Sequence, residues 1–118
     1  MYNNKLERSV KLLYKTEKII GGLKREMYAI GNDHSAVALK EVIKAHLESK
    51  GIEVKDFGTE STTASNYAAK AEEVANAVAS GECERGILIC GTGIGISIAA
   101  NKVNGIRAAV CSEPFSAK

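Results

Sequence analysis

The sequence feature that most constrains this chain is an apolar run that ends in a cysteine and then breaks into three glycines spaced two apart. It reads Gly86-Ile87-Leu88-Ile89-Cys90-Gly91-Thr92-Gly93-Ile94-Gly95. Four to eight apolar residues bounded by glycine are typical of a buried strand. The glycines after it allow a sharp turn and leave backbone N–H groups to point at a ligand. Cys90 would then lie at the carboxyl end of a parallel strand, where open α/β sheets bind ligands.

The rest of the chain from Met27 repeats this alternation of strands and helices. Short apolar runs predict strands over 27–31, 52–57, 87–90 and 106–111, and helical periodicity predicts helices over 39–47, 67–80 and 94–103. Ser112-Glu113-Pro114 predicts the opening of a further helix, with Ser112 as its cap. Such an order with short connections predicts a Rossmann-like, three-layer α/β/α fold around a parallel sheet. Since the last helix barely starts before Lys118, we expect the domain to be incomplete at its C-terminus.

Residues 1–26 differ from the body of the chain in charge. They carry seven Lys/Arg and three Glu, a balance of +4, whereas residues 27–118 carry nine Lys/Arg and eleven Asp/Glu, a balance of −2. Val10, Leu13 and Tyr14 share one face of a helix, so the segment is predicted to be a basic, helical N-terminal extension before a domain over 27–118. It is either a solvated extension or a surface that binds membranes or partners. The acidic body argues against nucleic-acid binding.

The composition is that of a globular protein of 118 residues, 45% apolar and 25% charged. The apolar runs fall short of the roughly 18 residues that a membrane span needs. The three cysteines lack CxxC spacing, so the sequence predicts neither a disulfide framework nor a zinc site, and a reducing cytoplasm is expected. Cys83 and Cys111 are interpreted as structural, and His46 as a surface residue.

The candidate site follows from the sheet edge. A cysteine is most often an inert core residue, but the position of Cys90 before a glycine turn and a helix N-terminus favours a working thiolate. Asp33-His34 follows the first predicted strand and therefore shares this edge. Tyr67 begins a helix beside it and either packs or lines a pocket. The glycines serve either tight strand-to-helix packing or an oxyanion or phosphate cradle; they match neither the GxGxxG fingerprint nor a Walker loop.

These residues carry a family resemblance. The segments that carry it are Ile30-Gly31-Asn32-Asp33-His34, Asp56-Phe57-Gly58-Thr59, the stretch from Arg85 to Lys102 (RGILICGTGIGISIAANK), Gly105-Ile106-Arg107-Ala108 and Cys111-Ser112-Glu113-Pro114-Phe115-Ser116-Ala117. Together they closely resemble the ribose-5-phosphate isomerase B family, which includes the galactose-6-phosphate isomerase subunits. The resemblance covers residues 27–118.

The resemblance implies isomerisation of ribose 5-phosphate to ribulose 5-phosphate through a cis-enediolate, without metal or organic cofactor, in a homodimer or larger homo-oligomer. It makes Cys90 the base that takes the carbon-bound proton and Thr92 a shuttle for the hydroxyl proton. Backbone N–H groups of Gly91, Thr92, Gly93, Ile94 and Gly95 would hold the oxyanion. Asp33 and Tyr67 would contact the sugar, and His34 would face the phosphate.

The resemblance also marks departures. Asn32 stands where the family has a small residue or cysteine, and Asn66-Tyr67-Ala68 stands where it has Asp-Tyr-Pro. The family's ring-opening histidine and most of its phosphate-binding arginines are expected beyond Lys118. Two functions therefore stay open: a sugar-phosphate isomerase, or an inactive relative that binds a phosphorylated sugar or pairs with an intact subunit. A general nucleotide-binding domain lacks its fingerprint.

Overall fold

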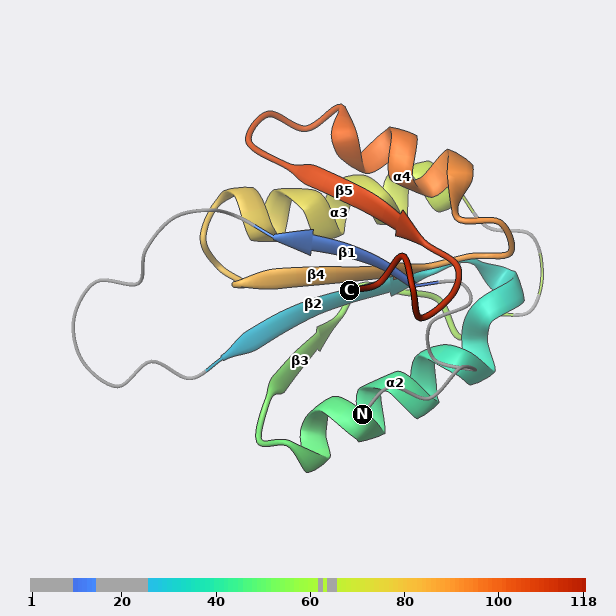
Figure 1. The fold of residues 1–118 in the computed structure, drawn as a ribbon, viewed down its shortest axis with the longest axis vertical. Helices are drawn as coiled ribbons and strands as arrows, with labels where there is room; N and C mark the ends of the chain where they lie inside the picture. Colours follow the sequence, from blue (N-terminus) through green and yellow to red (C-terminus); the bar gives the residue numbers. More distant parts are fainter. Residues whose placement is uncertain (1–9, 15–25, 62, 64–65) are drawn as a thin grey trace.

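The computed structural model describes residues 10–14, 26–61, 63 and 66–118, with the backbone alone for 10–14. In chain order the elements are β1 (Val10–Tyr14), β2 (Met27–Asn32), the 3-10 helix η1 (His34–Ala36), α2 (Val37–Ser49), β3 (Glu53–Asp56), α3 (Tyr67–Ala79), β4 (Arg85–Ile89), α4 (Ile94–Asn101) and β5 (Arg107–Cys111) (Figure 1). None of the helices described is long and apolar enough to cross a membrane.

The five described strands form one sheet in the order β3-β2-β4-β1-β5. The three strands β3, β2 and β4 are parallel, and their register pairs Ile30 with both Asp56 and Ile87. Because all three run the same way, their carboxyl ends meet at one edge of the sheet. The predicted α/β fold, with its parallel strands and flanking helices, is confirmed.

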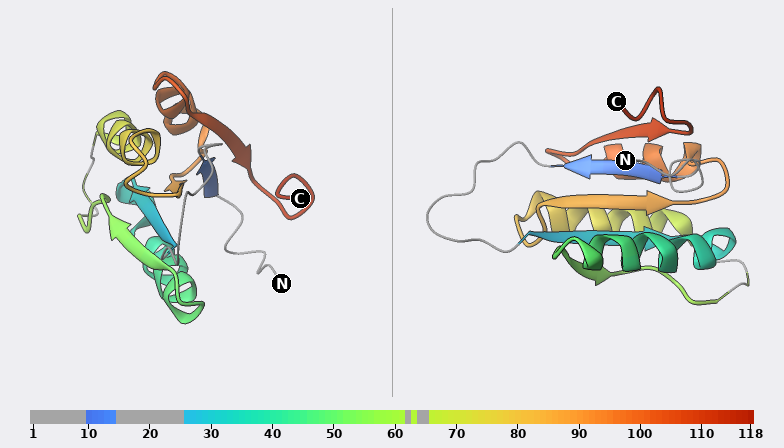
Figure 2. Two further views of the ribbon diagram at one scale, coloured as in Figure 1. Left: turned by 90° about the vertical axis from the view of Figure 1, so that its left-hand side faces the viewer. Right: turned by 60° about the horizontal axis from the view of Figure 1, so that its bottom comes forward.

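Alternating side chains of the central strands build a core on each face of the sheet. Ala29 of β2 and Leu88 of β4 point to one face, where they are buried beneath α3 and α4. Ile30 of β2 and its neighbour Ile87 of β4 point to the other face, beneath α2. Figure 2 shows α2 apart from the adjacent helices α3 and α4, with the sheet between them. The two-residue period of a strand therefore produces the three layers.

The N-terminal segment departs from its prediction. Val10–Tyr14 is a strand, not part of a helix, and it lies antiparallel between β4 and β5. The sheet is therefore mixed, and β5 hydrogen-bonds to β1 instead of to a parallel neighbour. Five residues with apolar positions at 10, 12, 13 and 14 fit a strand as well as a helical turn, and pairing on both sides decides between them. Residues 1–9 and 15–25 of the predicted extension lie outside the described residues.

The helix termini follow local signals with one exception. Asn66 caps α3 by accepting the N–H of Ala69, and Gly51, at φ +78°, follows the end of α2. The helix predicted to open at Ser112 is instead a turn. The Glu113 carboxylate accepts the N–H groups of Phe115 and Ser116, at 2.7 and 2.8 Å, so that Glu113 rather than Ser112 organises this segment.

Candidate functional site

The site is built on the carboxyl ends of β2 and β4, which are neighbours in the sheet. Asn32, the last residue of β2, pairs with Ile89, the last residue of β4. One residue further, the N–H of Asp33 donates to the carbonyl oxygen of Ile89 at 3.1 Å. This bond holds the Asp33-His34 turn directly beside Cys90, as the shared edge predicts.

Cys90 follows β4 and is almost fully enclosed, with 6% of its surface exposed. Its Sγ atom accepts a hydrogen bond from the backbone N–H of Gly93 at 2.8 Å. That geometry requires a tight loop, and Gly93 makes it by adopting φ +76°, the left-handed region that favours glycine. The loop therefore aims a backbone N–H donor directly at the sulfur.

Two backbone N–H groups of the loop from Gly91 to Gly95 already have hydrogen-bond acceptors within the segment from Cys90 to Gly95. Besides the Gly93 N–H, the N–H of Ile94 is engaged, because it donates to Oγ1 of Thr92 at 3.2 Å. An oxyanion held by these two groups would have to displace Sγ or Oγ1 from them. The other N–H groups of the predicted cradle belong to Gly91, Thr92 and Gly95. Thr92 and Gly91 are exposed, and so is the side chain of Ile94.

Asp33 is held by a neighbour that the sequence did not single out. Its Oδ1 accepts the backbone N–H of Ser35 at 2.9 Å and the Ser35 hydroxyl at 2.6 Å. The Ser35 hydroxyl also faces the glycine loop, since a Cβ added at Gly91 would lie 3.6 Å from it. Ser35 thus lies between the Asp33 turn after β2 and the glycine loop after β4. An Asp-x-Ser turn is a recognisable local signal for this contact. His34 is exposed.

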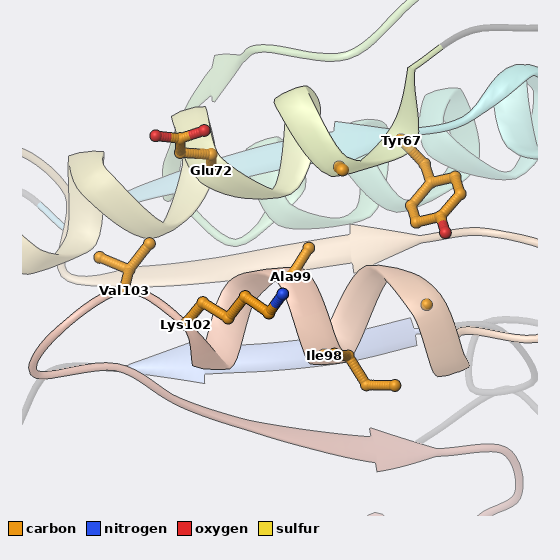
Figure 3. Close-up of a pocket in the computed structure, with 8 residues that line it drawn as sticks. Tyr67, Glu72, Ile98, Ala99, Lys102 and Val103 are labelled. Carbon is orange, nitrogen blue, oxygen red and sulfur yellow. The ribbon is translucent and has the colours of Figure 1, made fainter.

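Tyr67 reaches the site from α3. Its ring lies against the first turn of α4, so close that a Cβ added at Gly95 would sit 2.8 Å from the phenol oxygen. Figure 3 shows Tyr67 at one end of a groove between α3 and α4, with Val103 toward the other end. The groove has a volume of about 510 Å³, and it is lined by Tyr67, Ala68, Glu72, Gly95, Ile98, Ala99, Lys102 and Val103.

The structure therefore brings the predicted residues together in two groups. Asp33 and Cys90 meet on the β2–β4 edge, while Tyr67 and Gly95 meet at the mouth of the groove, whose lining excludes Cys90.

Within residues 26–61, 63 and 66–118, no cluster of three His, Cys, Asp or Glu side chains forms a metal site. Cys83 lies just before β4, away from this edge. Burial raises the pKa of its thiol, and the Glu82 carboxylate adds to that effect.

Comparison with known proteins agrees with this arrangement. The family model for ribose/galactose isomerase matches residues 28–118. Ribose-5-phosphate isomerase B of Escherichia coli is 59% identical over 90 residues, which are 76% of this chain and 60% of that protein. D-erythrulose-4-phosphate isomerase of Pectobacterium atrosepticum is 47% identical over 91 residues, again 76% of this chain and 60% of that protein.

A solved structure extends the likeness to the fold. Ribose-5-phosphate isomerase B of Clostridium thermocellum is 54% identical, superimposes with a TM-score of 0.74, and covers 77% of this chain and 62% of its own. The α/β fold of this chain is thus shared with a family of aldose–ketose sugar-phosphate isomerases. The chain belongs to the ribose/galactose isomerase family. It spans about 60% of the length of the two curated relatives described above.

Proposed function

We propose that this chain interconverts ribose 5-phosphate and ribulose 5-phosphate, with Cys90 as the base. The observation that carries the proposal is the Cys90 thiol, which accepts the Gly93 N–H at the edge where Asp33 also lies. The thiolate is the form that accepts a proton, and both the Gly93 N–H and the N-terminus of α4 lie beside the sulfur. Identity of 59% to ribose-5-phosphate isomerase B supports this substrate over other sugar phosphates.

The reaction is a proton transfer between adjacent carbons of the open-chain sugar. Cys90 takes the proton from carbon 2 of the aldose, and the electron pair moves to the carbonyl oxygen on carbon 1 to form the cis-enediolate. Thr92 carries the hydroxyl proton from the oxygen on carbon 2 to that on carbon 1. Return of the first proton from Cys90 to carbon 1 gives the ketose. A positioned base of this kind contributes about 10²- to 10⁴-fold to the rate.

The surrounding groups have separate parts in this proposal. N–H groups of the Gly91–Gly95 loop stabilise the enediolate oxygen, and one such donor is worth about 3 kcal/mol. Gly91, Thr92 and Gly95 supply these donors first, because the N–H groups of Gly93 and Ile94 are engaged inside the loop. Asp33 and Tyr67 bind the sugar hydroxyls, and His34 faces the phosphate.

The test is turnover of ribose 5-phosphate by the purified chain, followed as ketose formation. We expect the wild-type chain to form ribulose 5-phosphate, Cys90→Ala to lose at least 100-fold in kcat, and Cys111→Ala to keep wild-type kcat. Turnover no faster than that of Cys90→Ala would refute the isomerase proposal. In that case, calorimetric binding of ribose 5-phosphate without turnover would identify the alternative, an inactive sugar-phosphate binding module.

We also propose that the chain assembles into a homo-oligomer. Ile94 and Ile98, one turn apart on α4, are 60% and 55% exposed, and Val110 of β5 is 44% exposed. α4 and β5 are neighbours in the structure, and exposed apolar side chains on neighbouring elements are of the kind found at interfaces between subunits. Light scattering on the purified chain would contradict the proposal by giving a monomer mass at micromolar concentration.

A further inference from the structure

A buried polar cluster outside the catalytic residues ties the candidate site to the loop after β3. Its centre is the side chain of Asn32, which is fully buried. Its Oδ1 accepts the N–H of Thr59 at 3.0 Å, and its Nδ2 donates to the carbonyl oxygen of Thr59 at 3.0 Å. Nδ2 also donates to the carbonyl oxygen of Asp33 at 2.9 Å. One amide therefore binds both backbone groups of Thr59 and one of Asp33.

This arrangement extends the β2–β3 pairing beyond the end of the strands. The last backbone bond between the two segments runs from the N–H of Phe57 to the carbonyl oxygen of Ile30, at 2.8 Å. Two residues further along each segment, the Asn32 side chain binds Thr59 as a backbone partner would. The loop after β3 is thereby held to the residue that precedes Asp33.

Lys40 of α2 also belongs to this cluster. Its side chain is only 1% exposed, and its Nζ lies 3.2 Å from the carbonyl oxygen of Thr59 and 3.1 Å from Oδ2 of Asp56. The other oxygen of Asp56 accepts the N–H of Gly58 at 2.8 Å. A buried ammonium is costly, and an apolar side chain of the same size commonly serves stability as well or better. The close polar contacts of Lys40 are to Thr59, which Asn32 also binds, and to Asp56 at the end of β3; its approach to Glu41 is longer, at 3.7 Å.

Gly58 allows this cluster to close. A Cβ added at Gly58 would lie 1.8 Å from Oδ1 of Asn32 and 2.9 Å from its Cγ. Both atoms belong to a fully buried side chain with three hydrogen bonds, so they have no free direction in which to move. We call Asn32, Lys40, Asp56 and the backbone of Thr59 the Thr59 clamp.

We propose that Asn32 and Lys40 are positioning residues for the sugar-phosphate site, an inference that rests on the proposed function. Asp33 is fixed at both ends of its backbone: its N–H binds Ile89, the residue before Cys90, and its carbonyl oxygen binds Asn32. The Thr59 clamp thus sets where the Asp33-His34 turn stands relative to Cys90. Since the clamp acts on groups proposed to bind the sugar and phosphate, it governs substrate binding more than proton transfer.

The test compares three substitutions that open the clamp from three elements. Asn32→Asp keeps the shape and replaces both Nδ2 donors by an oxygen that faces two carbonyl oxygens. Lys40→Met keeps the length of the side chain and removes the charge. Gly58→Ala places a methyl group against Asn32. Lys50→Met, at an exposed position just after α2, is the matched control.

Two measurements on these full-length variants decide the outcome. Amide hydrogen exchange is expected to accelerate at least tenfold at Thr59 in each clamp variant, while Val74 and Val78 in the core of α3 keep their wild-type rates. Steady-state kinetics with ribose 5-phosphate are expected to show KM raised at least tenfold with kcat within about threefold of wild type. Lys50→Met is expected to change neither quantity.

The two proposals fail in different ways. Wild-type Thr59 exchange in every folded clamp variant overturns the positioning role, and so does fast exchange with unchanged KM. If the wild-type chain itself shows no turnover, the proposed function fails. The clamp is then judged by binding of ribose 5-phosphate to the wild type and to the variants: an unchanged affinity, or no binding, overturns it, and a tenfold loss in the variants supports it. Loss of folding in all three variants would assign the cluster a purely structural role and overturn the proposal.

Discussion

The sulfur of Cys90 lies 2.8 Å from the backbone nitrogen of Gly93, and Gly93 reaches it only in a left-handed conformation. The three loop residues from Gly91 to Gly93 therefore fold back on the thiol that follows β4, the middle strand of the sheet. The arrangement couples backbone conformation to the chemistry of the sulfur, and a matched pair of glycine substitutions separates the two.

Gly93→Ala is expected to impair turnover, and Gly81→Ala is not. Both glycines have positive φ, +76° and +84°, so alanine at either position costs about 1–2 kcal/mol of unfolding free energy. Gly81 lies before β4, away from the site. Chemical denaturation should show similar losses of stability for the two variants, whereas kcat per folded protein should fall at least tenfold for Gly93→Ala alone. Equal kcat values would contradict a role for the Gly93 N–H.

Gly95→Ala is expected to raise KM through Tyr67. The added Cβ would lie 2.8 Å from the phenol oxygen, and the ring, which is 45% exposed, can swing toward solvent to avoid it. The fold is therefore expected to survive while Tyr67 leaves its place at the mouth of the groove. In a Tyr67→Ala background the same substitution has no ring to displace and should leave KM unchanged. An equal effect of Gly95→Ala in both backgrounds would show that the loop itself, not Tyr67, is disturbed.

Leu12→Pro is expected to destabilise the protein by about 3 kcal/mol more than Leu12→Ala. Both substitutions remove the leucine side chain, but only proline removes the backbone N–H from a strand that is paired on both sides. Urea denaturation of the two variants measures the difference. Identical midpoints would mean that β1 contributes nothing to the sheet in solution.

Stability is expected to fall at alkaline pH partly through Cys83. This thiol is 1% exposed, and burial, followed by the charge of Glu82, raises its pKa in the folded state. Below about pH 8.5, the pKa of a free thiol, both states keep the proton. Above that pH the unfolded chain alone releases it, so the free energy of unfolding falls by up to about 1.4 kcal/mol per pH unit until the raised pKa is reached.

Cys83→Ala isolates this contribution. The cost of the substitution at pH 7, about 1 kcal/mol, should shrink between pH 8.5 and 9.5, because the variant has no thiol to ionise. The Tyr28 hydroxyl, whose pKa is also raised mainly by burial, contributes only nearer pH 10 and is present in both proteins. A cost that stays constant with pH would show that the Cys83 thiol ionises equally in both states.

The central part of the fold could be predicted because its signals are local. Apolar runs that end at a glycine mark β2 and β4, and the spacing of Ile43 and Leu47 marks α2. Parallel strands then place Asp33 beside Cys90 without further information. Strand β1 could not be predicted, because its five residues fit both periods and its partners lie more than 70 residues away in the sequence.

The residues around the site that could not be predicted, Lys40 and Asn32, escaped prediction for a different reason. Lysine within a helix and asparagine at the end of a strand are usually solvated, so Lys40 and Asn32 carry no sequence signal of burial. Their environment is created by the loop at Gly58 and Thr59, whose course depends on contacts that only the folded chain supplies. Only one of the two contacts of Ser35 could be predicted from the sequence. Its hydrogen bond to Asp33 is local, but its approach to Gly91 joins distant parts of the chain.

The position of β1 between β4 and β5 also sets an order of events during protein synthesis. Val10–Tyr14 leaves the ribosome before the two strands that flank it, Arg85–Ile89 and Arg107–Cys111, which follow more than 70 residues later. Until then the first strand has both edges unpaired, a state in which strands associate with other chains. Contacts so distant in sequence also close slowly. Nascent chains stalled before residue 85 should therefore recruit holdase chaperones that release once Cys111 has emerged.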